Sequence, residues 1–138
     1  MPEELSSIVE FSVNLKDQKE PEPLPLANYV GVINNTEVRM SQRETKYAAV
    51  AFHISVDQYP ADYKDGNPDG TTIIYRRVSL EDNPGARYGA RRFCEAIGAP
   101  LGKKIDISEW VGLEATVEVT HNTYEGRTSP NINKVQSV

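Results

Sequence analysis

The most regular stretch of this chain is Tyr47-Ala48-Ala49-Val50-Ala51-Phe52-His53-Ile54-Ser55-Val56. Its larger apolar side chains recur at every second position, which is the period of a strand with one buried face and one exposed face. The even-numbered residues are expected to line a core: Ala48, Val50, Phe52, Ile54 and Val56. Tyr47 and His53 lie on the opposite face and are expected to point outward.

Strand-like segments flank this stretch on both sides. Residues 28–39 form the preceding segment, with an interruption expected at Asn34-Asn35. Residues 71–80 form the following one, after a loop at residues 57–70 that is rich in Asp, Pro and Gly. In this later strand, burial of the apolar residues at positions 74, 78 and 80 turns Tyr75 and Arg77 outward. The same phase points position 76, an arginine, inward, so a bulge is expected nearby.

A helix is expected after the third strand. Asn83 is a suitable N-cap, and Pro84 fits the first helical position because its missing N–H would be unpaired there in any case. Gly98 supplies the C-terminal stop. One face of this helix is apolar at helical spacing: Ala86, Ala90, Phe93 and Ile97.

Two further strands are expected after the helix. A short turn at residues 107–111 comes first, and its Trp110 is expected to close one end of the core. The next strand alternates strictly and is expected to bury Leu113, Ala115, Val117 and Val119. The last strand covers residues 131–138 and is reached through a turn at Glu125-Gly126.

This order of three strands, one helix and two strands is that of the OB-fold, a five-stranded Greek-key barrel. The open face of such barrels commonly binds single-stranded nucleic acid or oligosaccharide. We therefore expect an all-β protein with one main helix, in which residues 27–138 form an OB-fold domain. Residues 1–26 form an acidic N-terminal arm, and residues 8–13 within it are a candidate for an extra strand at the sheet edge.

The charge of the chain is distributed unevenly. The formal net charge is -5, yet residues 1–26 hold six acids against two bases, a net of -4, and the rest of the chain has a net of only -1. A nearly neutral body can still gather its bases on one face. Charge alone therefore neither supports nor excludes binding to DNA.

Length and residue usage point to one soluble domain. No apolar run approaches the roughly 18 residues of a membrane span, and the N-terminus lacks the basic and apolar regions of a secretory signal. Cys94 is the single cysteine, so an internal disulfide is excluded and the cytoplasm is the expected compartment.

The sequence gives little support for a catalytic site or a metal site. His53 and His121 are the only histidines, and Cys94 is expected to face packing on the helix rather than a base. Residues 65–70 match the opening of an EF-hand calcium loop, but its twelfth position is an arginine where a bidentate Glu is needed. We therefore expect no enzyme activity, no metal site and no cofactor, and we interpret residues 65–70 as a plain loop.

The residues that remain suit a single strand of nucleic acid. Such strands are bound by aromatic rings that stack on bases and by Arg or Lys side chains that follow the phosphates. Rings and cations of this kind are expected on the second and third strands and on three adjoining loops. They are Arg39, Lys46, Tyr47, His53, Tyr59, Tyr63, Lys64, Tyr75, Arg77, Tyr124 and Arg127.

Several local strings strengthen this interpretation. They are Tyr29-Val30-Gly31-Val32, Arg91-Arg92-Phe93 with Ile97-Gly98, Asp106-Ile107-Ser108-Glu109-Trp110-Val111-Gly112 and Asn131-Ile132-Asn133-Lys134-Val135. With the order of elements, these strings resemble the OB-fold single-stranded DNA-binding proteins that bacteriophages encode beside their recombination and replication genes. The resemblance covers roughly residues 27–138.

The resemblance implies binding of single-stranded DNA with little sequence preference, during phage replication or recombination in the host cell cytoplasm. Many proteins of that family recruit partner enzymes through an acidic C-terminal tail, whereas the acidic segment of this chain is N-terminal. Either the recruitment of replication or recombination proteins has moved to the N-terminal arm, or this protein does not recruit partners in that way. Exposed edge strands also offer a route to a homodimer. The alternative function is a non-catalytic OB-fold module for protein interaction or virion assembly.

Overall fold

A five-stranded antiparallel sheet forms the centre of the computed structural model, which describes residues 6–138. The strands are β1 (Ala27–Met40), β2 (Lys46–Ile54), β3 (Thr71–Ser79), β4 (Glu114–Tyr124) and β5 (Arg127–Gln136). The helix α1 (Pro84–Ile97) lies between β3 and β4 in the chain, and short 3-10 helices occupy η1 (Leu15–Asp17), η2 (Val56–Gln58) and η3 (Ile107–Trp110). The expected order of three strands, helix and two strands is confirmed, and this mostly β architecture is compatible with an OB-like fold.

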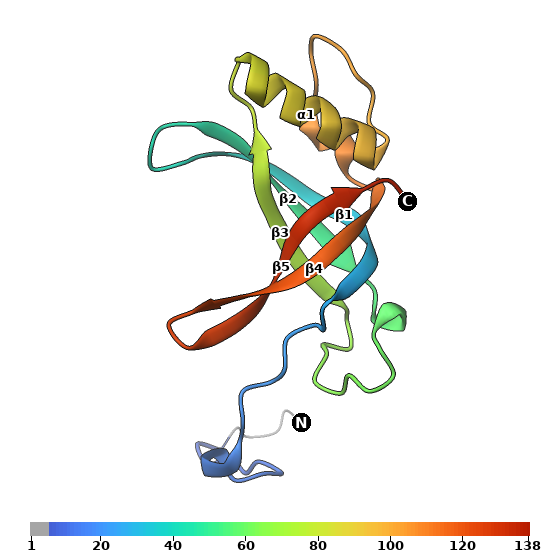
Figure 1. Cartoon of the computed structure of the whole chain (residues 1–138). Coiled ribbons are helices and arrows are strands. Elements are labelled where there is room, and N and C mark those ends of the chain that lie inside the picture. The colour runs from blue at the N-terminus through green and yellow to red at the C-terminus, as the bar shows by residue number, and fades with distance from the viewer. Residues whose placement is uncertain (1–5) are drawn as a thin grey trace, which may run out of the picture.

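The sheet is built around β1, which pairs with two partners. The strand order is β3-β2-β1-β4-β5. The first half of β1 pairs with β4 and the second half with β2, and the register against β2 shifts between Ile33 and Asn35. This shift is the interruption expected from the sequence, and a bulge of this kind bends a strand. The sheet curls so that its two edge strands, β3 and β5, approach each other (Figure 1).

The core side of β2 agrees with the alternation in its sequence. Ala48, Val50, Phe52 and Ile54 are completely buried. Val56 is 48% exposed, so its expected burial is wrong, because β2 ends at residue 54 and η2 turns the chain away. Alanines 49 and 51 on the outer face are also buried, because small side chains are covered by the neighbouring strands.

Each end of the curled sheet is closed by a different set of residues. α1 and η3 cover the upper end in Figure 1, where Phe93 contacts Phe52 edge to face at a centroid distance of 6.4 Å and Trp110 at 5.3 Å. Trp110 is 2% exposed, which confirms that it closes one end of the core. Leu24 closes the lower end, is 1% exposed, and has its carbonyl oxygen 2.8 Å from His121 Nε2.

The local signals for helix and turn are confirmed. Asn83 Oδ1 accepts a hydrogen bond of 2.9 Å from the backbone N–H of Ala86, and Gly98 ends α1 with a φ of 74°. Glu125 and Gly126 both have positive φ, 51° and 78°, as a tight two-residue hairpin turn requires. Because this turn pairs Tyr124 directly with Arg127, β5 begins at residue 127 rather than at the expected residue 131.

The N-terminal arm has no strand in its described part. Residues 8–13 were expected to add an edge strand, and this expectation is wrong, since these residues pair with no part of the sheet. Their side chains are exposed to solvent. Among residues 6–138, no helix is both long and apolar enough to cross a membrane.

Phe52→Ala should destabilise the protein strongly. The ring is completely buried, lies edge to face with Phe93, and approaches the backbone at Gly31, where an added Cβ would lie 3.1 Å from the ring. Removing it should lower the free energy of unfolding by about 3–5 kcal/mol in urea denaturation. Tyr124→Ala is the control, since that ring is 73% exposed. A loss below about 1 kcal/mol for Phe52→Ala would contradict this packing.

Candidate nucleic-acid interface

The outer face of β1, β2 and β3 carries two of the predicted ring-bearing residues. Tyr47 on β2 pairs with Arg39 on β1 and Ser79 on β3, and His53 pairs with Thr72. His53 Nδ1 lies 3.0 Å from Thr72 Oγ1. Tyr47 and His53 are both half-buried on the side opposite the core, as predicted. Their positions are six residues apart along β2, which corresponds to about 20 Å of strand.

A bulge in β3 sets the orientation of its two arginines. Ala48 pairs with Val78 and Val50 pairs with Tyr75, so Ala49 alone faces both Arg76 and Arg77. Such a bulge was expected from the sequence. Both arginines are exposed, so the inward orientation expected for Arg76 is wrong, and this side chain joins the surface instead. The bulge places two cations beside the shallow, alanine-lined part of the outer face.

Tyr75 does not point outward as expected from the sequence. It pairs with Val50, which faces the core, and its ring stacks on Phe93 with a centroid distance of 5.7 Å and an interplanar angle of 13°. Burial raises the pKa of the Tyr75 hydroxyl above its ordinary value of 10.0, and the charge of Arg77 opposes this shift. The expected phase was wrong because the bulge lies between Tyr75 and Val78, so both residues face inward although they are three apart.

The first hairpin, between β1 and β2, carries further cations. Arg39 is bound to Glu37 through two hydrogen bonds of 3.1 and 3.2 Å, which partly neutralise it. This contact raises the pKa of the Arg39 guanidinium. Lys46 and Arg43 are exposed near the tip and have no carboxylate within 4.0 Å in the part of the chain that the structure describes.

The second hairpin, between β4 and β5, carries Tyr124 and Arg127 at its tip, where both are exposed. Figure 1 shows that the two hairpins extend beyond the body on the same side, one above the other. Strand β3 runs between them at the front of this side. Exposed rings and cations from both hairpins and from β3 are thus brought to one side of the molecule, although they come from distant parts of the sequence.

The three predicted residues of the loop at residues 57–70 have internal partners. The Tyr59 hydroxyl donates to the carbonyl of Asn67 at 3.1 Å and lies 2.7 Å from Thr71 Oγ1. The Tyr63 hydroxyl donates to the carbonyl of Glu22 at 3.0 Å, and Lys64 Nζ to that of Ala61 at 2.9 Å. The two tyrosine rings pack edge to face at 5.2 Å. These side chains hold the lower end of the sheet together.

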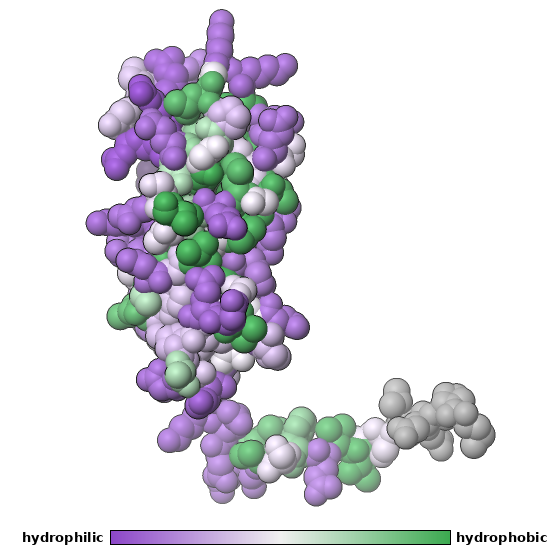
Figure 2. Space-filling model, turned by 90° about the vertical axis from the view of Figure 1, so that its right-hand side faces the viewer, coloured by the Kyte–Doolittle hydropathy of each residue, from purple (hydrophilic) through white to green (hydrophobic). Residues whose placement is uncertain are grey.

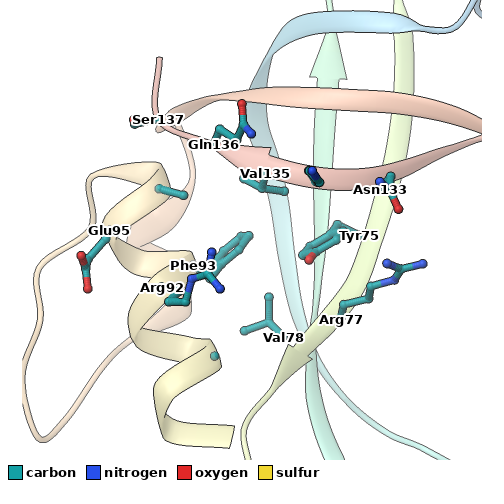
Figure 3. Close-up of a pocket in the computed structure, with 13 residues that line it drawn as sticks. Tyr75, Arg77, Val78, Arg92, Phe93, Glu95, Asn133, Val135, Gln136 and Ser137 are labelled. Carbon is teal, nitrogen blue, oxygen red and sulfur yellow. The ribbon is translucent and has the colours of Figure 1, made fainter. Parts of the chain in front are cut away.

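A separate groove of about 700 Å³ opens between α1, β3 and β5 (Figure 3). The stacked rings of Phe93 and Tyr75 line it, while Glu95 points away from it. Arg77 from β3, Arg92 from α1 and Lys134 from β5 also line the groove. Arg92 and Lys134 were not among the site residues expected from the sequence, because their proximity arises only when β5 returns beside α1.

Cys94 and the loop at residues 65–70, which were weighed as candidates for catalysis and calcium binding, make structural contacts. Cys94 is 2% exposed, and burial raises the pKa of its thiol above 9.0. Asp65 Oδ2 accepts from the backbone N–H of Glu22 at 2.8 Å, and Asn67 Oδ1 from that of Asp69 at 2.8 Å, as turn residues do. Within residues 6–138, no group of three or more His, Cys, Asp or Glu side chains is placed to hold a metal ion.

Comparison with known protein families and with curated proteins finds no match for this chain. The candidate interface therefore rests on the placement of its own residues.

Tyr59→Phe tests whether the hydroxyl of Tyr59 stabilises the fold. The change keeps the ring and removes the hydroxyl that bonds to Asn67 and Thr71. We expect the free energy of unfolding to fall by about 0.5–1.5 kcal/mol in urea denaturation. Tyr124→Phe, with an exposed hydroxyl, is the matched control and should leave stability unchanged. Equal stability of both variants would show that the loop contacts of Tyr59 contribute nothing.

Proposed function

We propose that this protein binds single-stranded DNA with little sequence preference and without catalysis. The observation that carries the proposal is the side of the molecule where both hairpins extend past β3 (Figure 1). Exposed cations that lack a carboxylate partner in the described chain come together there with exposed or half-buried rings. These residues are Arg43, Lys46, Tyr47, His53, Arg76, Arg77, Tyr124 and Arg127.

In the proposed mechanism, the strand crosses the outer face of β2 and β3 between the two hairpins. Tyr47 and Tyr124 offer ring faces for stacking, which is tolerant of sequence because every base has a flat face. Lys46, Arg76 and Arg127 neutralise phosphates and release the counterions that surround the nucleic acid.

This placement is the one used by Greek-key OB barrels, and we propose that the curled sheet belongs to that fold. Its strand order and the helix between β3 and β4 support the assignment. From the resemblance to phage-encoded proteins, we propose that the activity serves replication or recombination within the host cytoplasm, with partner proteins bound through the acidic N-terminal arm.

A second candidate function is a non-catalytic interaction or virion assembly module. The observation that favours it is the run of exposed apolar side chains in the arm, which a DNA-binding role does not use. Large exposed apolar groups in such a run mark contacts with other proteins.

Binding should be measured by fluorescence anisotropy of a labelled oligo-dT over a range of salt concentrations, with duplex DNA and single-stranded RNA as competitors. We expect affinity to fall steeply with salt, since each phosphate neutralised contributes about -0.7 to the slope of log K against log salt. Lys46→Ala or Arg76→Ala should each reduce the steepness by about 0.7. Arg87→Ala on α1, where Arg87 pairs with Asp82 at 2.9 Å, is the matched control and should change neither affinity nor slope.

The same titration tests the stacking ring. Tyr47→Ala should weaken binding by about 1–3 kcal/mol, whereas Tyr47→Phe keeps the ring and should bind like the unaltered protein. No binding to oligo-dT at low salt would refute the proposal and favour the interaction module. Tight binding that salt does not weaken would also contradict it.

A further inference from the structure

One segment of the N-terminal arm has the pattern of a strand but no partner. In residues 8–15, which we call the arm segment, Val9, Phe11, Val13 and Leu15 alternate with polar residues and are 51–65% exposed. Figure 2 shows apolar side chains gathered on the arm where it projects below the body. Apolar side chains at every second position are those of a strand with one buried face. In the described chain, this face is covered by nothing.

The body offers two strand edges that are also without partners. β3 and β5 end the sheet, and each has one side that no strand of the described chain pairs with. Unpaired backbone N–H and C=O groups on such edges are a template for an added strand. The groove of about 700 Å³ lies at the α1 end of the gap between β3 and β5. A second hollow of about 330 Å³ lies at the other end of this gap.

The size and chemistry of the groove match the arm segment. Tyr75, Val78, Phe93 and Val135 supply apolar walls for alternate side chains (Figure 3). Eight extended residues span about 26 Å, close to the about 30 Å of the nine residues of β3. Three cations also line the groove and have no carboxylate within 4.0 Å in residues 6–138: Arg77, Arg92 and Lys134. The arm segment carries one charged residue, the carboxylate of Glu10, and no base.

We propose that the arm segment of one copy docks as an added strand in the groove between β3 and β5 of a second copy. The occupant is a second copy because the arm leaves its own body in a fixed direction. Leu24 is buried and the Glu22 backbone is bound to Asp65 and Tyr63, which anchors the base of the arm. Prolines at positions 21, 23 and 25 favour an extended chain, and the arm points away from the sheet (Figure 1).

This arrangement gives the exposed apolar face of the arm segment and the cations of the groove one shared contact. Glu10 approaches the cations of the groove, while the apolar side chains of the arm segment cover the wall formed by α1, β3 and β5. The contact does not use Tyr47, Tyr124 or the hairpin tips. It shares Arg77 with the proposed DNA-binding side, so its test is made without nucleic acid.

The test is disulfide cross-linking between full-length chains. Phe11→Cys is mixed with Asn133→Cys, a position that is exposed on the β5 side of the groove. Cys94 is buried and leaves the added thiols as the reactive pair. Docking gives the two thiols an effective concentration of about 1 mM, so at roughly 10 µM protein the linked dimer should form about 100-fold faster than by random collision. Phe11→Cys mixed with Arg43→Cys, at the distant first hairpin, is the matched control.

A second measurement uses the mass in solution. Light scattering should give a mass above that of one chain that rises with protein concentration. Phe11→Ser and Lys134→Gln should each shift it to the single-chain mass with an unchanged midpoint of unfolding, because both side chains are exposed and neither change places like charges opposite each other in the sheet.

Three results would overturn the proposal. One is cross-linking no faster than in the control pair, and another is a single-chain mass at every concentration. The third is a disulfide within one chain of the double variant Phe11→Cys with Asn133→Cys at high dilution, which would mean that the arm folds back on its own groove.

Discussion

The aromatic contacts of Phe93 connect most of the structure. This one ring from α1 lies edge to face with Phe52 of β2, stacks on Tyr75 of β3 and touches Trp110 of η3. It thereby joins a helix, two strands and the turn before β4 at the upper end of the sheet. The position of α1 against the sheet depends on this cluster, and so does the groove that opens between α1, β3 and β5.

The bulge in β3 lies between the two surfaces that the proposed functions use, and Arg77 belongs to both. On one side of the bulge, Tyr75 belongs to the aromatic cluster and to the groove. At the bulge itself, Arg76 and Arg77 lie opposite a single residue of β2. Both arginines are therefore exposed, although they are neighbours in the strand. A regular strand would have pointed one of these arginines into the core, where an unpaired charge is costly.

The lower end of the sheet is closed by contacts that leave little room for a ligand. The Tyr59 and Tyr63 hydroxyls donate to backbone carbonyls, Tyr59 also bonds with the Thr71 hydroxyl, and the base of the arm is held through Leu24 and Glu22. This anchoring divides the arm into a part that packs on the body and a part that is exposed. Residues from 22 onward pack on the body, whereas residues 8–15 expose an apolar face that only another surface can cover.

Short-range patterns in the sequence determined the order of elements, the core face of β2, the cap of α1 at Asn83 and the hairpin turn at Glu125-Gly126. These features depend on residues a few positions apart, so periodicity and capping are enough to predict them. The orientation of Tyr75 and Arg76, the internal bonds of Tyr59 and the groove lined by Arg92 and Lys134 were decided only by the tertiary structure. They depend on strand register and on segments far apart in the chain, and a register shift of one residue reverses which face a side chain occupies.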